Sequence, residues 1–291
     1  MIHRLIALLL VPFLALAQPA AAKGFTSDRI SVTVTGSGPD VVLIPGLSSS
    51  PDVWKTTIAA VPGYRYHLIR VAGFDGAPAG ANATGPVLIP VADEIARYIA
   101  EARLKSPALV GHSMGGSMAL LIAERHPELA SRVMVVDMMP FLGAMFGGNS
   151  PDALGPIAGQ IRDGIAKSSG EARAKQIEGT IASMVRTEAM RPSAVAQSLA
   201  SDPVVSGQGM YDLIMTDLRP DLARIKVPLT VLWVVPQGAP LTLAQMEGYY
   251  RMSYANAPQA VLRHIPDSYH FIMYDQPAVF QGELRAFLTA K

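Results

Sequence analysis

The feature that most constrains the fold of this 291-residue chain is a Gly-His-Ser-Met-Gly sequence at residues 111–115. An apolar run at 108–110 precedes it and a helix-forming run at 117–125 follows it. A serine lifted from the end of a strand onto the start of a helix lies in a strained turn, so small residues are needed two positions away on each side. The helix N-terminus then favours the negative charge that develops on an attacked carbonyl. This context predicts Ser113 as a catalytic nucleophile. The alternative is a glycine-rich strand-to-helix turn without chemistry.

The same segment resembles the nucleophile elbow of the α/β-hydrolase family. The likeness extends from about Val32 to the C-terminus and is weakest between about Phe141 and Asp217. It implies an α/β fold with a mostly parallel central sheet, helices on both faces and a helical lid inserted after the sixth strand. It also implies hydrolysis that needs neither a metal nor an organic cofactor. Serine rather than aspartate at the elbow argues against dehalogenase and epoxide-hydrolase chemistry.

A serine hydroxyl needs a general base within hydrogen-bond reach. Of the six histidines, His270 follows the last predicted strand and precedes the final predicted helix. The resembling family places its base in this loop, usually as Gly-His-Phe, and here Tyr269 replaces the glycine. His270 is therefore the predicted base, with a buried structural histidine as the alternative. His112 is set aside because adjacent residues of a strand point to opposite sides.

The acid that orients the base is less clearly marked. In the family it usually follows the strand at 229–235, but the turn after that strand holds no carboxylate here. Some members place the acid after the sixth strand instead, and Asp137 occupies that position. The order Ser113, Asp137, His270 is then preserved, so Asp137 is the predicted acid. Asp267 is the second candidate, and Gln237 could serve as a neutral acceptor.

Two main-chain amides are predicted to hold the oxyanion. The apolar strand at 41–44 ends in Pro45-Gly46-Leu47. In the resembling family this turn donates one amide, which assigns the role to Leu47 here, with Ser48 as a weaker candidate. The second amide belongs to Met114, directly after the nucleophile.

The predicted substrate is a small, apolar carboxylic ester. Bulky apolar side chains crowd the start of the predicted lid, and an adaptable wall of this kind suits an acyl chain or an aromatic ester. They are Met138, Met139, Phe141, Met145 and Phe146. The same residues could equally do no more than pack the lid onto the core. A lactonase, amidase or perhydrolase using Ser113 is an alternative, as is a binding protein without turnover.

Strand and helix patterns alternate along the chain, which favours a parallel sheet covered on both faces. The core is predicted at residues 23–140 and 219–291, and the helical lid at 141–218. Within the lid, helices are expected near 156–167, 171–186 and 192–200.

The N-terminus indicates export. A positive start, an apolar run of about a dozen residues and an Ala-x-Ala site together predict a signal peptide at residues 1–22, cut after Ala22. The run is short for a membrane span, which needs about 20 apolar residues. We therefore expect a periplasmic or secreted protein with no stable membrane span after processing.

Overall composition excludes several classes of function. The formal net charge is +1, and there is no basic run, so no nucleic-acid partner is expected. The chain has no cysteine, which excludes disulfides, thiolate metal sites and a cysteine nucleophile.

Overall fold

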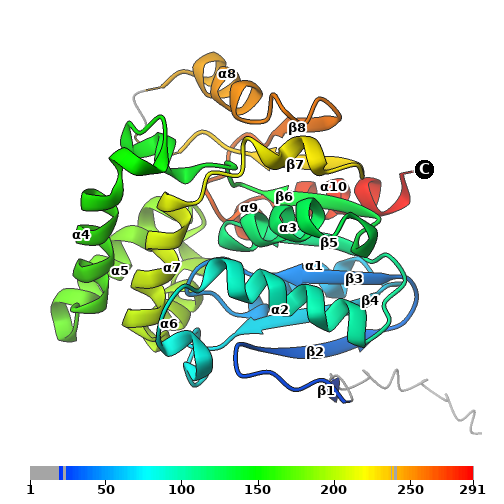
Figure 1. Ribbon diagram of the computed structural model, residues 1–291, viewed down its shortest axis with the longest axis horizontal. Helices are drawn as coiled ribbons and strands as arrows, with labels where there is room; N and C mark the ends of the chain where they lie inside the picture. The colour runs from blue at the N-terminus through cyan, green and yellow to red at the C-terminus, as the bar shows by residue number, and fades with distance from the viewer. Residues whose placement is uncertain (1–19, 22–23, 237, 239–240, 291) are drawn as a thin grey trace, which may run out of the picture.

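A central sheet organises the computed structural model, which describes residues 20–21, 24–236, 238 and 241–290. In this part of the chain the strand order is β1-β2-β4-β3-β5-β6-β7-β8 (Figure 1). The strands are β1 (Ala20–Ala21), β2 (Ile30–Gly36), β3 (Asp40–Ile44), β4 (Arg65–Val71), β5 (Ala108–His112), β6 (Arg132–Val136), β7 (Leu229–Trp233) and β8 (Ala260–His264). β2 is antiparallel to both neighbours, whereas all pairs from β4 to β8 are parallel. The predicted mostly parallel sheet is confirmed.

The inner parallel strands β3, β5, β6 and β7 are buried on both faces, which explains their mostly apolar sequences. Side chains alternate between the faces, as the two-residue period of a strand requires. In β3, for example, Val42 and Ile44 join one hydrophobic cluster, while Val41 and Leu43 join the other. Two apolar layers of helices are therefore needed to cover the sheet.

Helices supply these two layers (Figure 1). On one face, α2 (Leu88–Glu101), α3 (Met114–Arg125) and α8 (Leu243–Ser253) contribute buried side chains to the first cluster. On the other face, α9 (Ile272–Asp275) and α10 (Pro277–Thr289) pack with Trp54, just before α1 (Lys55–Ala60).

Four α-helices separate β6 from β7 and gather at one end of the sheet (Figure 1). They are α4 (Gly155–Ala166), α5 (Gly170–Met184), α6 (Arg191–Ala200) and α7 (Pro203–Met215). α4 packs against α7, and α5 packs against α6. The division of the chain into core and lid, and any movement of these helices, stay predictions.

The helix α7 was not predicted from the sequence. Its start is well marked, because the Asp202 carboxylate accepts hydrogen bonds from the Val204 and Val205 amides, and Pro203 occupies the first helical position. The sequence did not indicate this helix because the segment contains two glycines, and glycine has a low helix propensity. At Gly207, however, a Cβ atom would lie only 2.6 Å from the Arg162 carbonyl oxygen, so close packing of α7 on α4 requires the small residue.

The N-terminal prediction lies mostly outside the described residues. Of the predicted signal peptide, only Ala20 and Ala21 are described, and they pair with β2 as β1. In the described part of the chain β1 lies on the outer side of β2, so β2 is not the edge strand of the sheet. Among the helices described, none is long and apolar enough to cross a bilayer.

Candidate active site

Ser113 lies at the turn between β5 and α3, where the sequence predicted it. Its backbone φ of 52° is in the left-handed region, which residues other than glycine rarely adopt. The turn is possible because glycines flank it: a Cβ on Gly111 would overlap the main chain of Gly115, and one on Gly115 would overlap the main chain of Ile44. The Ser113 amide donates to the Val136 carbonyl at 3.0 Å, which fixes the turn to β6.

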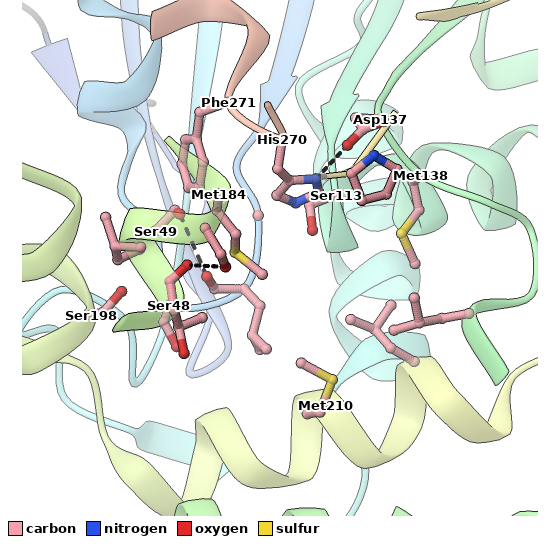
Figure 2. Close-up of a pocket in the computed structure, with 18 of the residues that line it drawn as sticks. Ser48, Ser49, Ser113, Asp137, Met138, Met184, Ser198, Met210, His270 and Phe271 are labelled. Atoms are coloured by element: carbon pink, nitrogen blue, oxygen red, sulfur yellow. Dashed lines mark hydrogen bonds and ion pairs between the residues drawn. The ribbon is translucent and has the colours of Figure 1, made fainter. Parts of the chain in front are cut away.

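His270 and Asp137 are joined directly, although 133 residues separate them. The distance from His270 Nδ1 to Asp137 Oδ2 is 2.6 Å (Figure 2). Asp137 follows β6, as predicted, with a φ of 52°. Its amide donates to the Leu232 carbonyl at 2.8 Å, which holds the turn against β7. The carboxylate is therefore brought to the imidazole by the backbone rather than by a flexible side chain.

The other oxygen of Asp137 is also hydrogen-bonded. Oδ1 accepts from the Val234 amide at 3.1 Å and from the Tyr250 hydroxyl at 3.2 Å. Burial, together with the nearby Asp137 charge, raises the pKa of Tyr250 well above its usual value. Tyr250 consequently stays a donor, and the 9% exposed Asp137 carboxylate has partners for both oxygens.

The second acid candidate does not reach the imidazole. Asp267 is exposed, and its Oδ1 accepts from Arg186 Nη1 at 2.7 Å. Asp267 makes no hydrogen bond to His270 in the described part of the chain. Gln237, the neutral alternative, lies outside the described residues. Of the two carboxylates considered, the structure thus brings only Asp137 to His270.

His112 contacts His270 although sequence reasoning set it aside. Its Nε2–H donates to the His270 carbonyl at 3.0 Å, and the ring centroids of the two histidines are 4.6 Å apart. The ring also lies 4.7 Å from that of Phe271. Burial lowers the pKa of His112 well below its usual value, so the imidazole is neutral. Strand alternation excluded His112 as a base but could not predict this contact, because the loop after β8 approaches it from elsewhere in the chain.

Ser113 and His270 both line the wall of one cavity (Figure 2). With Nδ1 bonded to Asp137, the second ring nitrogen, Nε2, is the one left to accept a proton. No hydrogen bond joins Ser113 to the imidazole among the described residues. Catalytic hydrogen bonds are often long before substrate binds, so this does not exclude His270 as the base.

The loop after β3 passes close to the elbow. A Cβ on Gly46 would come within 3.0 Å of both Ser113 Cβ and His112 Nδ1, so glycine permits the close approach. The Ser49 amide donates to the Gly46 carbonyl at 3.2 Å and closes a turn around Leu47. Within the described residues, the amides of Leu47 and Met114 donate to no protein acceptor. Both amides are therefore free to bind an oxyanion, and their role as oxyanion donors stays a prediction.

Comparison with known proteins shows the family of this chain. Residues 41–281 match the alpha/beta hydrolase family. The chain belongs to this family. Two curated relatives are pimeloyl-[acyl-carrier protein] methyl ester esterases. The one from Vibrio atlanticus is 26% identical over 71% of this chain and 80% of its own length. The one from Pectobacterium carotovorum is 26% identical over 86% of this chain and 94% of its own length.

Solved hydrolase structures share the fold of this family member. A hydrolase from Pseudomonas aeruginosa has a TM-score of 0.75 at 18% identity, covering 94% of this chain and 99% of that one. An esterase from Exiguobacterium antarcticum has a TM-score of 0.74 at 20% identity, covering 90% and 96%. An enol-lactonase from Burkholderia xenovorans has a TM-score of 0.71 at 18% identity, covering 94% and 100%. At these identities the likeness extends to the fold alone.

The cavity of this hydrolase has a volume of about 580 Å³ and lies between the sheet and the helices of the β6–β7 segment. Most of the predicted apolar residues line it, namely Met138, Met139, Met145 and Phe146. The prediction that Phe141 belongs to this apolar wall was wrong. It is 1% exposed, packs with Leu154 and Ile214 in a separate cluster, and carries the Arg219 guanidinium 4.5 Å above its ring.

Proposed function

We propose that this hydrolase cleaves a carboxylic ester through an acyl-enzyme on Ser113. The observation that carries the proposal is the 2.6 Å contact between His270 Nδ1 and Asp137, in a cavity whose wall holds both the imidazole and Ser113. A carboxylate on Nδ1 fixes the tautomer in which Nε2 accepts a proton, and it stabilises the imidazolium that results. The esterase names of the curated relatives point to the same bond type.

In the first half of the proposed reaction, Ser113 Oγ attacks the ester carbonyl carbon and its proton passes to His270 Nε2. The carbonyl oxygen becomes an oxyanion, which the amides of Leu47 and Met114 bind. Loss of one such donor costs roughly 3 kcal/mol in other hydrolases. The intermediate then collapses, the bond to the alkoxy group breaks, and the imidazolium donates its proton to the departing alcohol.

In the second half, a water molecule gives a proton to His270 and attacks the acyl carbon. Collapse of the second tetrahedral intermediate releases the carboxylic acid, and Ser113 recovers its proton. Asp137 keeps its charge throughout. The alternative of a binding protein without turnover rested on the missing carboxylate after β7, and that argument loses its force because Asp137 contacts the imidazole.

Replacing Ser113 by alanine tests the proposal. With short p-nitrophenyl esters, kcat of Ser113→Ala should fall by roughly 10³-fold or more, while the thermal unfolding temperature changes little. Ser131→Ala is the control, because Ser131 lies before β6, away from the cavity, and should retain full activity. A fluorophosphonate probe should label the wild type at Ser113. Retained hydrolysis by Ser113→Ala, or labelling at another residue, would refute the proposal.

A further inference from the structure

The cavity wall that α5 forms is polar along much of its length. Side chains that recur every three or four residues on α5 face the cavity, as one helix face requires. Among them, Arg173, Gln176 and Thr180 are polar, whereas Ile177 and Ile181 are apolar. This wall therefore offers both hydrogen-bond donors and a path for an apolar chain.

Arg173 is the cation of this wall. Its Nη2 donates to the carbonyls of Ser198 (3.2 Å) and Ser201 (2.5 Å). Among the described residues, Arg173 forms no ion pair with a carboxylate, and its Nε and Nη1 donate no hydrogen bond. Asp137, the acidic side chain on the cavity wall, is engaged by His270. Part of the guanidinium fork is thus available to a ligand in the cavity.

Arg173 lies far from the proposed reaction centre. The other end of the α5 face is Met184, whose carbonyl accepts from the Phe271 amide at 3.1 Å, next to His270. Arg173 precedes Met184 by 11 positions, which corresponds to about 16 Å along the helix axis. Only an extended ligand can occupy both ends, and Ile177 and Ile181 line the wall between them.

We propose that the cavity selects extended esters whose far end carries a carboxylate, bound by Arg173. A guanidinium and a carboxylate match in geometry and charge, and their hydrogen bonds are stronger than neutral ones. The partial burial of Arg173 reduces the screening by water that weakens exposed pairs. This inference rests on the proposed ester hydrolysis, and it adds the class of substrate.

Arg173 could instead serve only to hold α5 against the end of α6, since Ser198 and Ser201 lie at that end. The two roles differ in what a substitution does. Loss of a structural contact lowers activity on all esters by the same factor. Loss of a carboxylate-binding group lowers activity only on esters that carry the carboxylate.

Matched pairs of esters test the inference. One series compares monomethyl esters of dicarboxylic acids of graded length with methyl esters of monocarboxylic acids of the same length. A second series places the carboxylate on the alcohol part, as acetate esters of ω-hydroxy acids compared with acetate esters of alkanols. In at least one series, wild-type kcat/KM should be about tenfold or more higher for the carboxylate member at the matching length.

Arg173→Met should abolish this preference, because it should lower kcat/KM for the carboxylate member of each pair by about tenfold more than for the neutral member. Lys175→Met is the matched control, because Lys175 lies on α5 outside the cavity wall and pairs with Glu171. It should retain the preference. An equal loss on both members of each pair in Arg173→Met, or no preference in the wild type, would overturn the inference. If the wild type hydrolyses none of the esters, the proposed function fails as well.

Discussion

At the scale of single residues, the site depends on how Asp137 is held. A carboxylate that only touched the imidazole could rotate away, but Oδ1 is bound by the Val234 amide and the Tyr250 hydroxyl. Oδ2 then lies in the one direction that meets His270 Nδ1. The acid therefore works as a fixed acceptor, and its substitution should affect turnover far more than folding.

Asp137→Asn should lower kcat by about 10³- to 10⁴-fold, because an amide nitrogen facing Nδ1 favours the wrong tautomer of the base. The asparagine oxygen can still accept from Val234 and Tyr250, so the unfolding temperature should change little. Steady-state kinetics on a p-nitrophenyl ester, with thermal denaturation in parallel, measures both. Asp267→Asn is the control and should be active, since Asp267 pairs with Arg186 at the surface. The reverse pattern would show that Asp267 is the acid.

At the scale of elements, the site exists because loops from distant parts of the sheet meet at the carboxyl ends of β3, β5, β6 and β8. The strands fix where each loop starts, but side chains fix how the loops lie against one another. His112, the last residue of β5, holds the loop after β8 through the His270 carbonyl. We expect it to act as a positioning residue for the base.

His112→Phe keeps an aromatic ring against His270 and Phe271 but loses the donor. Kcat should fall by up to about 10²-fold with little change in KM, because a small displacement of a catalytic group costs about that much. His112→Gln can again donate to the carbonyl and should recover part of the loss. Equal activity of the two variants, or a change confined to KM, would contradict a positioning role through the hydrogen bond.

The sequence was informative where a local pattern determines structure. The apolar runs of β3, β5, β6 and β7 predicted their strands because both faces of a parallel sheet are covered. Ser113 was predicted from its Gly-x-Ser-x-Gly turn, and His270 and Asp137 were predicted from the positions that the resembling family uses after its strands. The rest depends on tertiary packing. The helix α7 was not predicted because it contains glycines, whose presence only its contact with α4 explains. Phe141 packs in a separate apolar cluster instead of lining the cavity. No local sequence pattern predicts the contact between His112 and His270.

At the scale of the whole molecule, buried titratable groups make the free energy of unfolding depend on pH. Buried histidines lower stability as pH falls, whereas a buried glutamate lowers it as pH rises. Burial lowers the pKa of His67 and His112, so both are neutral in the fold. Their contribution is present above the unfolded pKa of about 6.5 and is lost as pH falls below it. Glu124 on α3 is the opposite case. Burial, reinforced by the charge of Asp221, raises its pKa to about 7.

Glu124→Gln should therefore stabilise the protein at pH 8 but not at pH 5. The side chain is 7% exposed, and Oε2 has no partner among the described residues, so ionisation leaves an unsolvated charge. The folded state binds the proton more tightly than the unfolded chain, whose glutamate has a pKa near 4.5. Stability due to the protonated form is present below that value and is lost as pH rises through about 7. Glutamine removes this loss, which amounts to about 1–3 kcal/mol at pH 8.

Thermal denaturation at pH 5 and pH 8 measures the difference. A gain of several degrees in Tm is expected for Glu124→Gln at pH 8 only, given the usual change of about 2–4 °C per kcal/mol in chains of this size. Glu178→Gln is the control, since Glu178 is exposed on α5, and its Tm should follow the wild type at both pH values. Equal shifts of Glu124→Gln at the two pH values would mean that a neutral packing effect, rather than the ionisation of Glu124, changes the stability.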